Sequence, residues 1–239
     1  MDTCNCQADS CLLCDAKLPS DLSAEQVCGI RGLLSRRSYD PREVLVRAGD
    51  PCSNIFIVRA GHLKLTIPGT DGNEQIIGLA GEGHLLGFES MDELIYPYTA
   101  ETLATTVVCK IRHRDMLQVL AQNPKVSLRL LESLNGQLVQ ARKLIHVLGH
   151  KTAVEKVAGF LLAQIPPTAV DGHNEVPPLT LSRAEISEML GITVETVSRL
   201  MAEFRRMGAI DAPRGRVTIL DREQLSMFAG YLFESTCHQ

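Results

Sequence analysis

The stretch from Thr180 to Ile210, TLSRAEISEMLGITVETVSRLMAEFRRMGAI, constrains the fold of this chain more than any other. It predicts two short helices joined by a tight turn. Ser182 is placed to cap the first helix, and Glu185, three residues later, completes a capping box. Gly191 ends that helix where a positive φ is needed, and Thr193 caps the next helix. We therefore expect a helix-turn-helix.

The second helix of this pair has one apolar and one polar face. The apolar face is formed by Val197, Leu200, Met201 and Phe204, and the polar face by Glu195, Ser198, Arg199 and Ala202. An arginine can donate two hydrogen bonds to guanine, and a glutamate can accept one from the amino group of cytosine. The pattern favours a DNA-reading helix over a helical pair with a solvated Glu–Arg face.

Charge and a following hairpin strengthen this interpretation. The segment AIDAPRGRVTIL predicts a two-stranded wing with Arg214 and Arg216 at its tip. From residue 199 to 216 there are five arginines and two acidic residues, although the whole chain has a net charge of −4. This balance favours a specific DNA-binding surface over a nonspecific polycation. We predict that the DNA-contacting residues are Thr193, Glu195, Thr196, Ser198, Arg199, Arg205 and Arg206.

These motifs resemble the winged helix-turn-helix of the CRP/FNR superfamily of bacterial transcription regulators, and the resemblance extends from Leu22 to about Leu225. The recognition helix of FNR-type members carries E-x-x-S-R, which Glu195, Ser198 and Arg199 match. The resemblance implies a DNA-binding homodimer on an inverted-repeat operator with TTGAT-like half-sites. It also implies RNA polymerase as a partner.

Residues 20–114 contain short strand-like runs separated by Gly-Asp, Pro-Gly and Asp-Gly turns, which is typical of an antiparallel jelly roll. The resemblance implies an α+β protein. Its expected parts are a cysteine-rich segment at 1–19, a cyclic-nucleotide-binding-type β-roll at 20–114, a dimerisation helix at 115–150 and a winged helix-turn-helix at 151–239.

The predicted β-roll lacks one residue that cyclic-AMP binders of this fold use. Gly81-Glu82 and Thr99-Ala100 match their phosphate-binding pattern, but Tyr98 stands where the phosphate-pairing arginine belongs. A buried phosphate without a cation costs several kcal/mol. We therefore expect no cyclic AMP.

Cysteines crowd into the first residues of the chain. Cys6, Cys11 and Cys14 have a ferredoxin-like spacing, and Cys4 is the substitute for one of them. Zinc is the competing occupant, and a redox-active segment is a further alternative. The resemblance implies a [4Fe–4S] cluster that senses oxygen, with Cys109 as the remote fourth ligand. The N-terminal spacing departs from the C-x2-C-x5-C of the best-known members.

A heptad-like apolar pattern follows Pro124 and predicts a dimer seam rather than a helix packed only on its own β-roll. Its members are Leu131, Leu134, Leu138, Ala141, Ile145 and Leu148. An inverted-repeat operator requires a two-fold axis, which also favours a homodimer.

Other functional classes fit less well. A haem- or nitric-oxide-sensing regulator of the same superfamily would hold its cofactor with His or other axial ligands, and the five cysteines argue against this alternative. The sequence shows no nucleophile–base motif, phosphate loop or paired acidic site, so we expect no enzyme. We find no apolar run of about 20 residues and no export signal, and therefore expect a cytoplasmic protein without a membrane span.

Overall fold

The computed structural model describes residues 30–69, 74–88, 95–149, 152–164, 181–212 and 217–230. The chain divides into two compact units, Met1–Leu138 and Val139–Gln239. The division falls inside the long helix α3 (Pro124–Leu148), so each unit contains one part of that helix. Among the described residues, no helix is long and apolar enough to cross a membrane.

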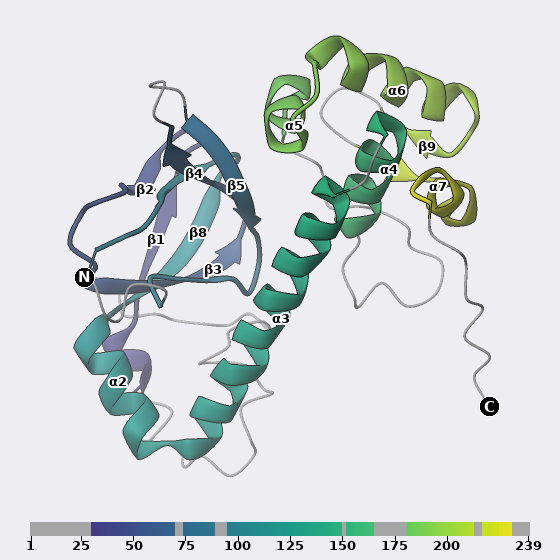
Figure 1. Ribbon diagram of the computed structural model, residues 1–239. Coiled ribbons are helices and arrows are strands. Elements are labelled where there is room, and N and C mark those ends of the chain that lie inside the picture. Colours follow the sequence, from purple (N-terminus) through teal and green to yellow (C-terminus); the bar gives the residue numbers. More distant parts are fainter. Residues whose placement is uncertain are drawn as a thin grey trace, which may run out of the picture. The chain divides into compact units, whose positions relative to one another are not determined.

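The described strands of the first unit form two four-stranded antiparallel sheets, as expected for a jelly roll (Figure 1). The first sheet has the order β1 (Ser35–Tyr39), β8 (Thr106–Arg112), β3 (Asn54–Ala60) and β6 (Leu85–Leu86). The second has the order β2 (Val44–Val46), β7 (Thr99–Thr102), β4 (Leu63–Pro68) and β5 (Glu74–Ala80).

Strand β3 contributes to two separate cores, which explains its uninterrupted run of apolar residues. Phe56 and Val58 enter the core between the two sheets, whereas Ile55 and Ile57 enter a second core. Side chains alternate along a strand, so a strand that is buried on both faces must be apolar at successive positions. Polar and apolar residues therefore do not alternate along this strand.

The second core lies on the helix side of the first sheet, and we call it the helix-side core. Besides residues of the sheet it contains residues of α2 (His113–Gln122) and of the start of α3. Its members are Ile30, Leu34, Ile55, Ile57, Leu85, Cys109, Ile111, Met116, Val119, Val126 and Leu130. The sheet and the beginning of α3 are therefore held together by shared packing.

Gly61 makes the turn between β3 and β4 possible. Its φ is +88°, and a Cβ at this position would lie 2.5 Å from Thr106 Oγ1 and 2.6 Å from the Thr105 carbonyl oxygen. Both the left-handed backbone and the close approach exclude other residues without a local rearrangement. The turn thus requires glycine.

The helical segment expected over 115–150 is interrupted between α2 and α3. Asn123 separates the two helices, with φ −132° and ψ 82°. Pro124 disfavours the helical conformation of the residue before it. The Asn123 side-chain amide donates to the Val119 carbonyl oxygen (2.8 Å) and so caps the end of α2.

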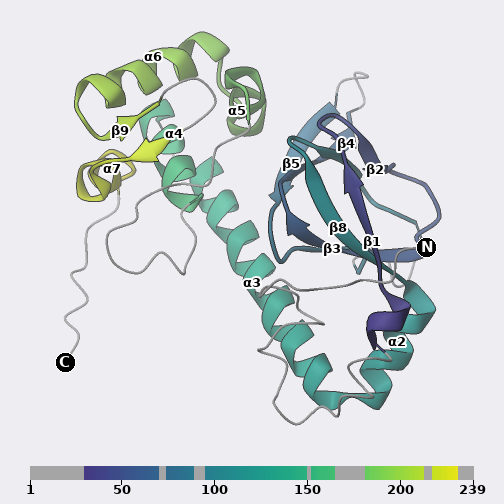
Figure 2. The ribbon, with the colours of Figure 1, turned by 180° about the vertical axis from the view of Figure 1, so that it is seen from behind.

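The second unit combines the end of α3 with α4 (Ala153–Ala163), α5 (Arg183–Leu190), α6 (Val194–Arg206) and α7 (Arg222–Phe228), drawn from behind in Figure 2. A short antiparallel pair, β9 (Ile210–Asp211) and β10 (Thr218–Ile219), lies between α6 and α7 in the sequence. Helix α4 packs against both α6 and α7. The Phe204 and Phe228 rings stack with centroids 5.2 Å apart, which ties α6 to α7. This is the expected winged helix-turn-helix.

Candidate nucleic-acid interface and sensor site

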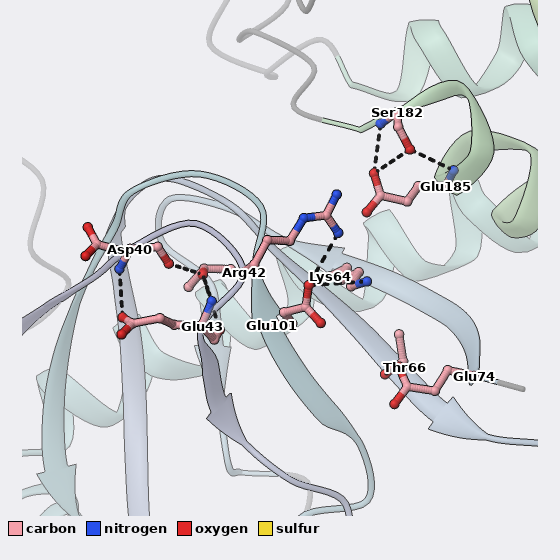
Figure 3. A network of polar contacts seen from close by, with 10 residues as sticks. Asp40, Arg42, Glu43, Lys64, Thr66, Glu74, Glu101, Ser182 and Glu185 are labelled. Carbon is pink, nitrogen blue, oxygen red and sulfur yellow. Dashed lines mark hydrogen bonds and ion pairs between the residues drawn. The ribbon is translucent and has the colours of Figure 1, made fainter. Parts of the chain in front are cut away.

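The capping box predicted for α5 is present (Figure 3). The Glu185 backbone N–H donates to Ser182 Oγ (3.2 Å), and the Ser182 backbone N–H donates to Glu185 Oε2 (2.8 Å). Gly191 ends the helix in the left-handed region, with φ 63° and ψ 42°. The turn that follows α5 is therefore set by local contacts.

Lys156 makes a further contact with α5 that has no counterpart in the sequence patterns. Its ammonium donates to the carbonyl oxygen of Leu190, at the end of α5, over 3.3 Å. A cation at a helix C-terminus also interacts favourably with the helix dipole. The two residues are separated by 34 positions, and no local motif signals such a pairing.

Helix α6 begins at its predicted cap, because Thr193 Oγ1 accepts from the Thr196 backbone N–H (3.3 Å). The four predicted apolar residues are buried in the second unit. The polar face is exposed along Glu195, Ser198, Arg199 and Ala202. The structure therefore brings the three predicted base-reading side chains together on one open face.

The exposed face of α6 carries groups of both charges. The pKa of Glu195 is lowered by hydrogen bonds from its own backbone N–H and from the Thr193 hydroxyl, so its carboxylate is ionised at neutral pH. At the other end of the helix, Arg205 Nε lies 4.0 Å from Asp211 Oδ1, and both side chains are more than half exposed. Such an exposed ion pair is weak, so a DNA phosphate can compete for Arg205.

The predicted wing is described only at its base. Asp211 pairs with Thr218 and Ile210 with Ile219. The predicted tip, with Arg214 and Arg216, lies outside the described residues.

Cys109, the predicted remote cluster ligand, lies on β8 between Arg36 of β1 and Ile57 of β3 in the sheet register. Its side chain is fully buried in the helix-side core. The other four predicted ligands, Cys4, Cys6, Cys11 and Cys14, lie outside the described residues. Within the described part of the chain, no three His, Cys, Asp or Glu side chains gather into a group that could hold a metal ion.

Tyr98, at the position of the phosphate-pairing arginine, is buried in the core between the sheets. Its hydroxyl accepts from the Gly87 backbone N–H over 3.3 Å. A neutral ring with a bonded hydroxyl therefore occupies this position, and it supplies no positive charge for a phosphate.

The turn between β5 and β6 contacts α3 through two residues that sequence patterns did not single out. Ser133 Oγ donates to the Gly83 carbonyl oxygen (3.4 Å). In the orientation of the Gln137 amide that gives both of its groups a partner, its NH₂ group donates to the Leu85 carbonyl oxygen (3.1 Å). Its oxygen accepts from the Leu85 backbone N–H (3.2 Å). These contacts lie four residues apart on α3 and fix one face of the helix to the β-roll.

A β-roll followed by a long helix and a winged helix-turn-helix defines a class of DNA-binding regulator, and comparisons with known proteins agree. Residues 36–123 match the cyclic nucleotide-binding domain family, and residues 155–228 match the Crp-like helix-turn-helix domain family. The structure of FixK2 from Bradyrhizobium japonicum is similar, with a TM-score of 0.72 and 26% identity, covering 83% of this chain and 98% of that one.

Curated relatives specify the family further. The transcriptional activator protein anr of Pseudomonas aeruginosa is 34% identical over 223 residues, covering 92% of this chain and 91% of the relative. The fumarate and nitrate reduction regulatory protein of Escherichia coli is 26% identical over 230 residues, covering 95% and 92%. The chain belongs to the CRP/FNR superfamily and is a DNA-binding transcription regulator of the FNR type, not an enzyme.

Proposed function

We propose that this regulator binds an inverted-repeat operator with TTGAT-like half-sites as a homodimer, and that oxygen controls binding through a [4Fe–4S] cluster. The observation that carries the operator proposal is the open face of α6, where Glu195, Ser198 and Arg199 lie at the spacing of FNR-type members. Arg199 pairs with a guanine and Glu195 accepts from a cytosine amino group. The sugar–phosphate backbone of the DNA beside these bases is contacted by Thr193, Thr196, Arg205 and Arg206. RNA polymerase is the proposed protein partner of the DNA-bound regulator.

The proposed cluster ligands are Cys6, Cys11, Cys14 and Cys109, with Cys4 as the substitute. Thiolates are the ligands that such clusters prefer. Ile30 and Leu34, which follow the cysteine-rich segment, pack in the same helix-side core as Cys109. Fifteen residues separate Cys14 from Ile30, and a fully extended chain between the two spans at most about 55 Å, so the segment can reach Cys109 from this anchor. The residues present therefore fit the group.

When bound, the cluster supplies iron–sulfur bonds that oxygen attacks. The chain's own contribution is to connect Cys109 to the dimerisation helix. Val126 and Leu130 of α3 belong to the same core as Cys109, and Leu134 packs against it. A change in how the N-terminal segment is held at Cys109 thus affects α3 through direct packing. This change shifts the equilibrium between monomer and dimer.

The proposed dimer seam lies on α3. Among its members, Leu131, Leu138, Ile145 and Leu148 are large apolar residues that the described chain leaves exposed, by 39–67% of their surface. Leu134 is half-buried against the β-roll, and Ala141 is exposed. Leu128, exposed by 61%, extends the stripe by one turn. A second copy of α3 would cover this stripe, as in a short coiled coil.

The experiment that tests the sensor is anaerobic reconstitution of Cys109→Ser beside Cys52→Ser. Cys52 is the matched control, because it is also a buried β-roll thiol but packs in the core between the sheets. We expect wild type and Cys52→Ser to show an absorbance near ~400 nm that bleaches in air, with iron and acid-labile sulfide. Cys109→Ser should lose all three signals and anaerobic operator binding, with its circular dichroism unchanged.

Other outcomes would overturn the sensor proposal. Stoichiometric zinc without sulfide would assign the cysteines to a structural zinc site. A sharp Soret band would indicate haem. A Cys109→Ser protein that still binds its operator tightly only without oxygen would exclude Cys109 as a ligand.

A further inference from the structure

A groove with a cavity volume of about 500 Å³ lies inside the second unit, bounded by the end of α3, by α4 and by α7. Its floor is small and apolar, with Gly159, Leu162 and Ala163 from α4 beside Ser226 of α7. Gly159 and Ser226 are buried, whereas Leu162 and Ala163 remain half-exposed to the groove. A volume of this size is typical of sites for small organic molecules.

The rim of the groove is cationic. Arg142 and Lys143 project from α3, and Arg222 projects from the first turn of α7. None of the described residues that line the groove is acidic. Elsewhere in the described chain arginines do pair, for example Arg129 with Glu132 at 2.8 Å, whereas none of these three side chains forms an ion pair with another described residue.

The groove uses a different face of α3 from the proposed dimer seam. Val139, Arg142, Lys143 and His146 lie at i, i+3, i+4 and i+7 and share one side of the helix. The seam residues Leu138, Ala141 and Ile145 lie on another side. Helix α6, which carries the recognition face, contributes no described residue to the lining. The groove therefore shares no described lining residue with the proposed seam or with the recognition helix.

We propose that this groove binds an amphiphilic organic anion, with an apolar body of medium length and a carboxylate head. The apolar body lies on Leu162, Ala163 and Val139, where it removes apolar surface from water. The carboxylate lies between Arg142 and Arg222, whose planar guanidinium groups match carboxylate geometry. Because the bound anion connects α3 to α7, it stabilises the folded second unit. Its lining residues are different from those of the recognition face and from the proposed cluster ligands.

The test is isothermal titration calorimetry of the full-length protein with decanoate. Decyltrimethylammonium, a cationic amphiphile with the same chain length, is titrated as the control. We expect saturable binding of one decanoate per chain and none of the cation. Arg142→Gln/Arg222→Gln should weaken decanoate binding by about tenfold, since two partly exposed ion pairs are lost. The control Arg114→Gln/Arg129→Gln removes the same charge outside the groove and should bind as wild type.

A second variant tests the apolar floor. Ala163→Phe fills the groove and should abolish decanoate binding while circular dichroism and operator affinity stay unchanged. Equal decanoate affinity in all variants, equal binding of the cationic amphiphile, or no saturable binding up to about 1 mM decanoate would each overturn the proposal.

Discussion

The helix-turn-helix and the β-roll differ in the range of the contacts that form them. In the helix-turn-helix, the cap of each helix joins residues three positions apart, such as Ser182 with Glu185 and Thr193 with Thr196. In the β-roll, Thr102 Oγ1 donates to the Asp40 carbonyl oxygen across 62 positions. Local contacts form at little cost in loop entropy, whereas distant ones require the whole roll to close.

The two regions also differ in where their chemistry lies. Arg199 is exposed, so its loss should reduce DNA binding without changing stability. Cys109 is fully buried, so its substitution risks a change in both ligation and packing. For this reason the effect of Cys109→Ser, the largest that we expect, is interpretable only beside Cys52→Ser.

The next largest effect should come from Ile145→Glu on α3, the helix shared by both units. We expect a monomer by light scattering, because the proposed seam would bury an unpaired charge. Operator affinity should fall by about 100-fold or more, since two half-sites no longer bind together. Ile145 is 67% exposed in the single chain, so monomer stability should change little.

The control for Ile145→Glu is Ile77→Glu, at an isoleucine of β5 that is 42% exposed. It should remain dimeric and bind the operator as wild type does. An unchanged dimer mass for Ile145→Glu would place the interface elsewhere on the molecule.

Substitutions at two arginines of α6 should separate base reading from phosphate binding. Arg199→Ala should cost about 1–3 kcal/mol on the operator and relax preference at the guanine of the half-site. Arg205→Ala should weaken operator and random DNA alike, and it should reduce the slope of log affinity against log salt by about one. Fluorescence anisotropy with both DNAs checks this, and an equal loss on both DNAs for Arg199→Ala would refute its role.

The range of the contacts also explains what the sequence could predict. The caps at Ser182 and Thr193 and the Gly191 turn were confirmed, because each depends on a few neighbouring residues. The jelly roll followed from strand runs and turns together with the resemblance. The contacts of Lys156 with Leu190 and of Gln137 with Leu85 had no sequence signal, since distant segments must first come together. The groove of α3, α4 and α7 escaped prediction for the same reason.

Ser182→Ala should have a smaller and local effect. Loss of the cap should cost about 1 kcal/mol in the stability of α5. Glu185, which is 6% exposed, also loses one of its partners. Hydrogen exchange of the Glu185 amide should become about fivefold faster, while amides of the β-roll keep their protection. Faster exchange throughout the β-roll would show that the two regions do not fold independently.

The smallest effect should appear in the pH dependence of the β-roll. Burial lowers the pKa of His84, and its Nδ1 accepts from the Gly81 backbone N–H at 3.2 Å, so folding favours the neutral ring. A histidine whose pKa is lower in the folded state binds its proton more readily when unfolded. The contribution of neutral His84 to the free energy of unfolding is therefore present at higher pH and is lost as the pH falls below about 6.5.

His84→Asn keeps an acceptor for Gly81 but does not titrate, so stability should fall less steeply for this variant between about pH 6.5 and 5. Most carboxylates remain ionised over this interval, which isolates the histidine contribution. Urea unfolding followed by a β-roll probe measures the difference, with His146→Asn, an exposed histidine of the second unit, as the control.

Burial also lowers the pKa of His62 beside Gly81, so part of the slope should survive in His84→Asn and disappear only when both histidines are replaced. If the slope of His84→Asn equals that of wild type, His84 does not titrate with folding.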